Sequence, residues 1–331
     1  MTPSQIASAL SMLLSIRQPV FLWGPPGVGK SQVVSQVARQ RGMALRDIRA
    51  VLLDPVDLRG LPRITADGNS VWCPPGFLPR EGIDPDEGIL FLDELNAAPP
   101  LVQAACYQLV LDRCIGEYRL PDGWSIVAAG NREKDKAVTH RMPSALANRM
   151  VHLEFEVSLD DWLRWAQPAG IRAEVCSFLR FRPKLLHDFD PLGASRAFAS
   201  PRSWEFASRI LAANPPSDLE YELFQGTIGT VGAAEFMGFL TVWRELPTVE
   251  DILQSPETSP IPAEPAALYA LCEALALKAA SETIESLVTY ADRLPPEFSI
   301  LLMRDAVCKD TSLVECDAFV RWAESNAEVL M

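Results

Sequence analysis

The segment FLWGPPGVGKSQVV, residues 21–34, constrains the fold of this 331-residue chain more than any other stretch. Three glycines and two prolines lie between an apolar run and a helical pattern, and Lys30 and Ser31 follow directly. The octapeptide GPPGVGKS fits the pattern G-x-x-x-x-G-K-[ST]. Glycines let backbone N–H groups converge on phosphates, and the helix that follows adds the positive end of its dipole. With a strand before it and a helix after it, this loop is predicted to bind a nucleotide.

The loop pattern also assigns individual roles. We expect Lys30 to meet the β- and γ-phosphates of ATP and the Ser31 hydroxyl to ligate Mg²⁺. The predicted nucleotide-binding residues of this Walker A motif are Gly24, Pro25, Pro26, Gly27, Val28, Gly29, Lys30, Ser31 and Gln32.

An acidic pair follows the apolar run GILFL, as in a Walker B motif. We expect Asp93, at the carboxyl end of a buried strand, to hold Mg²⁺ through water, and Glu94 to polarise the attacking water. Acidic residues often end strands for structural reasons alone, so this pair gains its meaning from the phosphate loop in the same chain. A carboxylate placed to activate water favours hydrolysis over transfer to a small acceptor.

Short apolar runs alternate with helical patterns through the first half of the chain. Continuous apolar character with polar or glycine ends predicts buried strands. These runs span residues 19–24, 88–94, 124–131 and 150–155. Strands separated by helices predict an α/β fold with a parallel sheet covered on both faces.

Two hairpins are predicted inside this α/β part. Residues 63–72 contain Asp67-Gly68, a strong signal for a tight turn between β-prone flanks. Residues 113–124 contain Gly116 and then a Pro-Asp-Gly turn.

The strand signal ends near residue 158, and helical periodicity takes over. Residues 253–265 carry four prolines without an apolar period, which predicts a linker, and residues 266–327 predict two or three more helices. We therefore expect three parts: an α/β nucleotide-binding core over 1–157, a helical lid over 158–247, and a linker with a C-terminal helical extension over 248–331.

Charge and cysteine usage narrow the classes of partner and compartment. The formal net charge is −13, and such a surface repels a phosphate backbone, so broad nucleic-acid binding is disfavoured. No apolar run reaches the length that a membrane span needs. The seven cysteines form no C-x-x-C pair and are odd in number, which is typical of reduced thiols in a cytoplasmic protein.

Taken in order, these segments resemble an AAA+ ATPase and, within that superfamily, are similar to the MoxR group. The matching segments are LWGPPGVGKS, DLRGLP (57–62), GILFLDELNAAP (88–99), LPDGWSIVAAGN (120–131), PSALANRM (143–150) and SPRSW (200–204). The resemblance covers residues 1 to about 247 and implies a P-loop AAA+ parallel-sheet core with a helical lid. The two hairpins resemble the helix-2 insert and the pre-sensor-1 hairpin of that clade.

The resemblance also implies roles for three residues that would have little meaning alone. Asn131 would be sensor 1, Arg149 the arginine finger, and Arg202 sensor 2, in a hexameric ring. The chain departs from the family where Arg132 follows the sensor asparagine and where methionine, in place of phenylalanine, follows the finger arginine. Arg132 and Arg141 are therefore rival candidates for the finger.

The resulting functional hypothesis is a cytoplasmic ATPase that uses ATP and Mg²⁺ to remodel or assemble a protein client. The resemblance implies a client that bears a von Willebrand A-type domain. The alternative is a nucleic-acid motor or loader, because relatives in the clade include helicases. Few basic residues lie in the hairpins, namely Arg63, Arg113 and Arg119, and this disfavours the alternative. A nucleotide-gated scaffold that scarcely hydrolyses ATP is a third class, and Glu94 argues against it.

Overall fold

The computed structural model describes residues 1–135, 140, 142–193, 195–246 and 248–326. The chain divides into two compact units. The α/β unit comprises Met1–Asp161 and Phe189–Ala194, and the helical unit comprises Trp162–Asp188 and Ser195–Met331. Among the described residues, no helix is both long enough and apolar enough to cross a membrane.

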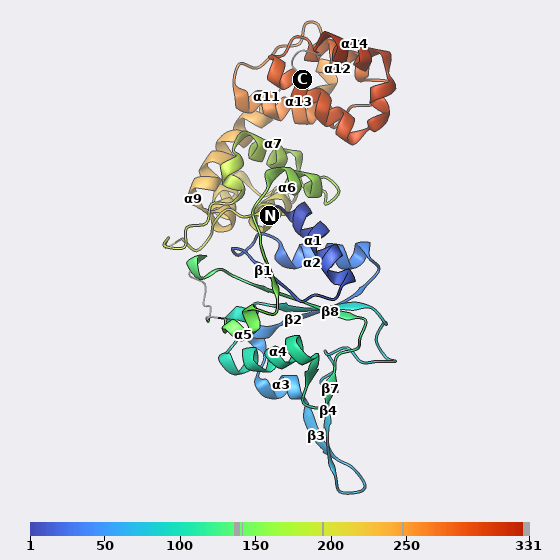
Figure 1. Ribbon diagram of the computed structural model, residues 1–331. Coiled ribbons are helices and arrows are strands. Elements are labelled where there is room, and N and C mark those ends of the chain that lie inside the picture. The colour runs from blue at the N-terminus through green and yellow to red at the C-terminus, as the bar shows by residue number, and fades with distance from the viewer. Residues whose placement is uncertain (136–139, 141, 194, 247, 327–331) are drawn as a thin grey trace. The chain divides into compact units, whose positions relative to one another are not determined.

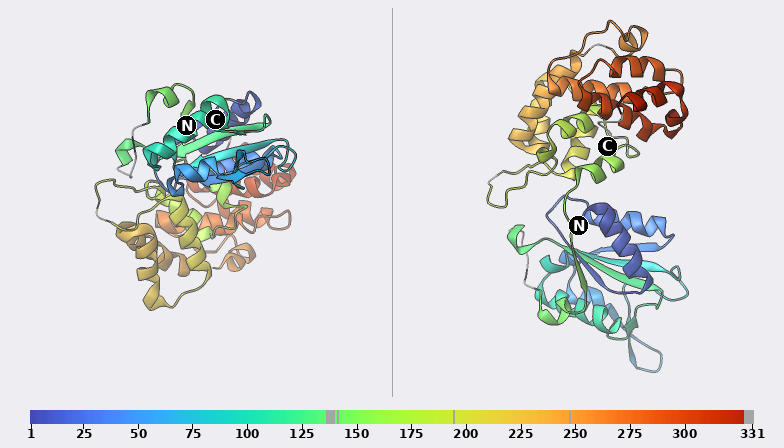
Figure 2. Two further views of the ribbon diagram at one scale, coloured as in Figure 1. Left: turned by 90° about the horizontal axis from the view of Figure 1, so that it is seen from below. Right: turned by 45° about the horizontal axis from the view of Figure 1, so that its top comes forward.

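The α/β unit is built on a five-stranded sheet (Figures 1 and 2). Its strands are β1 (Val20–Trp23), β2 (Ala44–Arg49), β5 (Gly88–Asp93), β8 (Trp124–Gly130) and β9 (Val151–Glu154). They lie in the order β2-β5-β8-β1-β9, and every neighbouring pair is parallel. The expected α/β fold with a parallel sheet core is confirmed. Because all strands run in one direction, their carboxyl ends meet at one edge of the sheet.

Four of these strands were predicted and one was missed. β2 reads ALRDIR, in which only Ile48 is buried, because β2 is an edge strand and exposes charged side chains. A strand of this kind lacks the continuous apolar run that marks its neighbours.

Helices cover both faces of the sheet. They are α1 (Pro3–Ser15), α2 (Lys30–Gln40), α3 (Pro55–Arg59), α4 (Pro100–Asp112) and α5 (Ser144–Ala147), with short 3₁₀ turns at Ala50–Leu52, Leu95–Ala97 and Glu133–Asp135. Helices α1 and α2 pack against one face through Leu10 and Val34, which share a core with Phe91 of β5. Helix α4 packs against the other face, where Val102 shares a core with Leu90 and Leu92. The alternation of buried side chains along β5 thus serves two separate cores.

Both predicted hairpins are present. The first pairs β3 (Leu61–Ile64) with β4 (Ser70–Cys73) and extends away from the sheet (Figure 1). The second is short and pairs β6 (Cys114–Ile115) with β7 (Tyr118–Arg119). The backbone N–H of Trp72 donates to Glu117 Oε2 at 3.2 Å, so the two hairpins are in contact.

The helical unit follows α6 (Leu159–Ala166), which begins in the α/β unit. Its other helices are α7 (Ala173–Phe181), α8 (Pro201–Ala212), α9 (Ser217–Arg244), α10 (Val249–Gln254), α11 (Pro265–Ala276), α12 (Ile284–Ala291), α13 (Pro296–Lys309) and α14 (Asp317–Ser325), with 3₁₀ turns at Pro183–Leu186 and Thr311–Glu315.

Two features of the helical unit bear on the sequence predictions. An aromatic core forms around Phe178, whose ring lies 5.3 Å from Trp204 and 5.1 Å from Phe236. Beyond residue 265 the described chain forms α11 to α14, whereas two or three helices were expected. Short helices such as α12 hold too few turns to show a clear period. The predicted division of this part of the chain at residue 247 stays a prediction.

Candidate functional site

The glycine-rich loop lies between the end of β1 and the start of α2. Gly27 and Gly29 have φ angles of 78° and 97°, a region that favours glycine because it has no Cβ. Gly29 caps α2, and Lys30 is the first helical residue. The free backbone N–H groups and the positive end of the helix dipole therefore lie at this loop, which is the arrangement that phosphate requires.

Lys30 connects the loop to the neighbouring strand β8. Its ammonium donates to the carbonyl oxygens of Gly24 at 2.7 Å and Pro25 at 3.0 Å, and to Asn131 Oδ1 at 3.0 Å. The predicted lysine and the predicted sensor asparagine are thus in direct contact, although 101 positions separate them in the sequence. The Lys30 ammonium therefore lies between the carbonyl groups of the phosphate loop and the side-chain amide of Asn131, which follows β8.

Ser31 connects the same loop to strand β5. Its hydroxyl donates to Asp93 Oδ2 at 2.9 Å, so the two predicted Mg²⁺ ligands are adjacent. A hydroxyl and a carboxylate are oxygen donors that fit a small hard cation, which usually keeps several waters when bound. Mg²⁺ held there would neutralise phosphate charge.

Glu94 is exposed and has a left-handed backbone, with φ 55° and ψ 33°. This region is uncommon for residues other than glycine, and such conformations cluster at functional sites. The Glu94 N–H donates to Asp93 Oδ1 at 3.0 Å. The turn places the two carboxylates at the carboxyl edge of the sheet, one directed to Ser31 and the other exposed.

Negative charge at this edge affects Asp47 of the neighbouring strand β2. Asp47 is exposed at the surface, but partial desolvation by its neighbours raises its pKa, the charge of Asp93 adds to the effect, and Arg49 opposes it. The negative charge of Asp93 therefore influences the protonation of a residue on the neighbouring strand.

Asn96 supports the end of β8 and was missed by the sequence reasoning. It is buried, and its Nδ2 donates to the Asn131 carbonyl at 2.6 Å. Gln103 of α4 donates to the Asn96 carbonyl at 3.4 Å and to the Ala98 carbonyl at 3.0 Å. The signal was present in the sequence, since a polar amide stands two positions after Glu94 in an otherwise apolar stretch.

Arg149 lies at the other end of the strands from the phosphate loop. Val20 at the start of β1 pairs with Val151 at the start of β9, and the Gln18 amide donates to the Arg149 carbonyl at 3.5 Å. Arg149 is exposed, and no hydrogen bond or ion pair of its side chain is found within the described ranges. The four residues of β1 alone span about 10 Å, at about 3.3 Å per residue, so the end of β1 near Arg149 is at least that far from the phosphate loop.

Two successive hydrogen bonds through the His152 side chain link the two ends of β1. Trp23, directly before the phosphate loop, donates from Nε1 to His152 Nδ1 at 2.8 Å. His152 Nε2 then donates to the carbonyl of Ala147, the last residue of α5, at 2.8 Å. Sequence reasoning assigned no such contact, because the partners come from three different elements.

The other predicted arginines have different settings. Arg132 forms a two-point ion pair with buried Asp135, with both N–O distances at 3.0 Å. Arg141 lies outside the described residues. Arg202 is an exposed residue in the first turn of α8, in the helical unit, and its role as sensor 2 stays a prediction.

Comparisons with known proteins found structures of low similarity. No family model and no curated protein matches the chain. NtrX from Brucella abortus matches with a TM-score of 0.41 and 16% identity over 65% of this chain and 51% of that one, so the match spans about half of the NtrX chain. NtrX in complex with ADP gives 0.42 and 16% over 98% and 68% of the two chains. A Thermotoga maritima RuvB P216G mutant gives 0.39 and 18% over 82% of each. Scores this low carry no argument about the fold or the function.

Proposed function

We propose that this chain is a MoxR-like AAA+ ATPase that hydrolyses ATP at subunit interfaces and uses the energy to remodel or assemble a protein client. One observation carries the proposal. The carboxyl ends of β1, β5 and β8 bring together Lys30 with Asn131 and Ser31 with Asp93. Each pair joins parts of the chain that the phosphate-loop hypothesis requires to meet.

These four residues and Glu94 then have separate tasks. Lys30 exchanges its carbonyl contacts for the phosphate oxygens of ATP, and Ser31 and Asp93 hold Mg²⁺. Glu94 accepts a proton from the attacking water, and its exposed position gives water access. Asn131, fixed from behind by Asn96, orients that water near the terminal phosphate.

Arg149 completes the site of a neighbouring subunit. Charge spreads over the phosphoryl oxygens as the bond breaks, and an arginine from a second copy would add its positive charge to that of Lys30. Arg149 lies near the start of β1, whereas the phosphate loop of the same subunit follows the end of β1. Its exposed guanidinium is available to a second copy in a head-to-tail ring, which we propose to be a hexamer. Arg132 is the weaker candidate because its charge is already paired with Asp135. Arg202 is proposed to sense the nucleotide from the helical lid.

The proposed client is a protein, such as one that bears a von Willebrand A-type domain, because the first hairpin exposes large apolar side chains on both of its faces. Ile64 and Trp72, on one face, are 78% and 39% exposed, and Leu61, on the other, is 70% exposed. Exposed apolar patches of this kind are typical of contacts with protein. In the second hairpin Arg113 donates to the carbonyls of Pro121 and Trp124, so it is unavailable to a nucleic-acid phosphate.

Two substitutions test the proposal. Lys30→Ala should abolish ATP binding, because the lysine contacts phosphates in the ground state. Glu94→Gln should bind ATP and lower turnover about 10²- to 10⁴-fold, because the glutamate acts only on the attacking water. Calorimetry with ATP and a phosphate-release assay measure the two effects.

The outcome that contradicts the proposal is equally specific. A Glu94→Gln enzyme with the wild-type rate would show that the acidic pair has another role. Strong stimulation of turnover by single-stranded DNA, with tight binding at about 0.15 M salt, would favour a nucleic-acid motor.

A further inference from the structure

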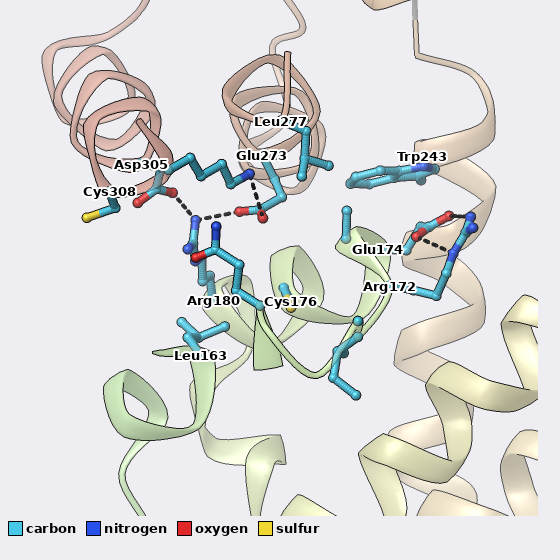
Figure 3. A pocket seen from close by; sticks show the side chains of 15 residues that line it. Leu163, Arg172, Glu174, Cys176, Arg180, Trp243, Glu273, Leu277, Asp305 and Cys308 are labelled. Carbon is cyan, nitrogen blue, oxygen red and sulfur yellow. Dashed lines mark hydrogen bonds and ion pairs between the residues drawn. The ribbon is translucent and has the colours of Figure 1, made fainter. Parts of the chain in front are cut away.

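A cavity of about 520 Å³ lies wholly within the helical unit. Figure 3 shows α7 supplying Cys176 and Arg180, α11 supplying Glu273, and α13 supplying Asp305. Lys309, the last residue of α13, also lines it. The volume falls in the range that small-molecule sites occupy.

A charge cluster forms the polar wall of this cavity. Arg180 Nη1 donates to Glu273 Oε2 at 2.6 Å and to Asp305 Oδ2. Lys309 Nζ lies 3.6 Å from Glu273 Oε1. The Arg180, Glu273, Asp305 and Lys309 side chains are at most 18% exposed. Two cations and two carboxylates are thus largely removed from water, and the more exposed Arg304 also pairs with Asp305 at 3.4 Å.

Two hydrogen-bond donors of this cluster have no acceptor, although their charges are paired. Arg180 Nε and Lys309 Nζ are buried, and neither atom has a hydrogen-bond partner among the described residues. The Lys309–Glu273 distance is too long for a hydrogen bond. Burial lowers the pKa of Lys309 although both carboxylates oppose the shift. Buried donors without acceptors are costly, so a ligand whose acceptor oxygens reached these two atoms would remove that cost.

The rest of the wall is apolar or already paired. Leu277 and Trp243 lie on the same side in Figure 3, and Leu163 lies opposite. Arg172 and Glu174 form an ion pair with each other and add no unpaired charge. Burial raises the pKa of Cys176 to about 12, so its thiol is not a nucleophile near neutral pH. These properties suit binding and not covalent chemistry.

We propose that this cavity binds a small organic carboxylate with an apolar or aromatic body. The carboxylate accepts hydrogen bonds from Lys309 and Arg180, and the body lies against Trp243 and Leu277. The ligand contacts α7, α11 and α13 at once, so its binding stabilises the packing of the C-terminal helices on α7. The proposal does not depend on ATP hydrolysis.

Titration of the full-length protein with 3-phenylpropionate tests this site, with 3-phenylpropanamide as the neutral analogue of the same shape. We expect the carboxylate to bind at least about tenfold more tightly than the amide, since charge-assisted hydrogen bonds are the stronger ones. Lys30→Ala should leave this binding unchanged, because that lysine belongs to the phosphate loop.

Two cavity variants and one matched control complete the experiment. Lys309→Met keeps the stem and removes the donor, and it should weaken carboxylate binding about tenfold or more. Trp243→Leu tests the apolar wall if Lys309→Met does not fold. Lys278→Met removes a lysine that pairs with exposed Glu250 outside the cavity, and it should bind as the wild type does. Equal binding of acid and amide, wild-type binding by both cavity variants, or no binding at about 10 mM would overturn the proposal.

Discussion

Gly130, at the end of β8, has no room for a side chain. A Cβ there would lie 2.0 Å from Asn96 Oδ1 and 2.9 Å from the Phe21 ring. Asn96 in turn donates to the carbonyl of Asn131, so the glycine allows the amide to hold the residue that contacts Lys30. The lack of a Cβ at Gly130 therefore allows the end of β8 to lie where Asn131 contacts Lys30 of the phosphate loop.

Gly130→Ala should destabilise the protein by about 1–3 kcal/mol, because Asn96 and the ring of Phe21 must both shift. It should also lower ATP turnover, since Asn131 moves with the strand end. The double variant Gly130→Ala with Asn96→Ala removes the closest clash and should recover part of the stability but not the turnover. Urea denaturation and phosphate release measure both, and unchanged stability in Gly130→Ala would contradict the tight packing described here.

At this scale the sequence predicts best where chemistry is tied to a fixed local pattern. Lys30, Ser31 and Asp93 were placed by motif, and the structure brings Ser31 to Asp93 and Lys30 to Asn131. Asn96 and His152 were not found, because their partners are backbone carbonyls or side chains on other elements. A polar amide in an apolar stretch marks Asn96 in the sequence, but spacing along one segment does not show which groups on other elements it contacts.

The β3–β4 hairpin exposes four large apolar side chains, those of Leu61, Ile64, Val71 and Trp72. Every residue of both strands is exposed, and the two strands pair only with each other within the described residues. The turn signal Asp67-Gly68 predicted this hairpin well because the turn needs a positive φ, and Gly68 has φ 79°. Edge strand β2 was missed for the opposite reason, since its pairing depends on β5 and not on its own pattern.

Deleting Thr65 to Ser70 should leave basal ATP hydrolysis intact and uncouple it from the client. The tip adds little to either core, so the free energy of unfolding should change by less than about 0.5 kcal/mol. Ile64→Ser should weaken client stimulation as well, whereas Ile83→Ser, at an exposed position outside the hairpin, serves as the matched control. Loss of soluble protein on deletion would instead assign the hairpin a structural role.

For the whole molecule, the proposed ring depends on Arg149. An arginine supplied by a neighbour is worth about 10³- to 10⁵-fold in rate, so a site without one is severely incomplete. The pairing of β1 with β9 puts this residue and the phosphate loop at opposite ends of the same strands. A head-to-tail contact between copies would bring the two ends together.

Arg149→Ala should therefore keep ATP binding and lose turnover by about 10³-fold or more. Mixing Arg149→Ala with Lys30→Ala subunits should restore part of the activity, because some interfaces pair an intact loop with an intact arginine. Sedimentation with and without ATP should show nucleotide-promoted oligomers. Arg132→Ala is the comparison: it leaves buried Asp135 unpaired and should reduce stability first. A fully active Arg149→Ala monomer would end the ring hypothesis.

Arg180 joins helix α7 to α11 and α13 through its two carboxylate partners. Paired charges that are largely removed from water resist separation, because each would be left uncompensated. We therefore expect α11 and α13 to move together with α7 in any rotation of that helix, as a lever arm moves with its pivot.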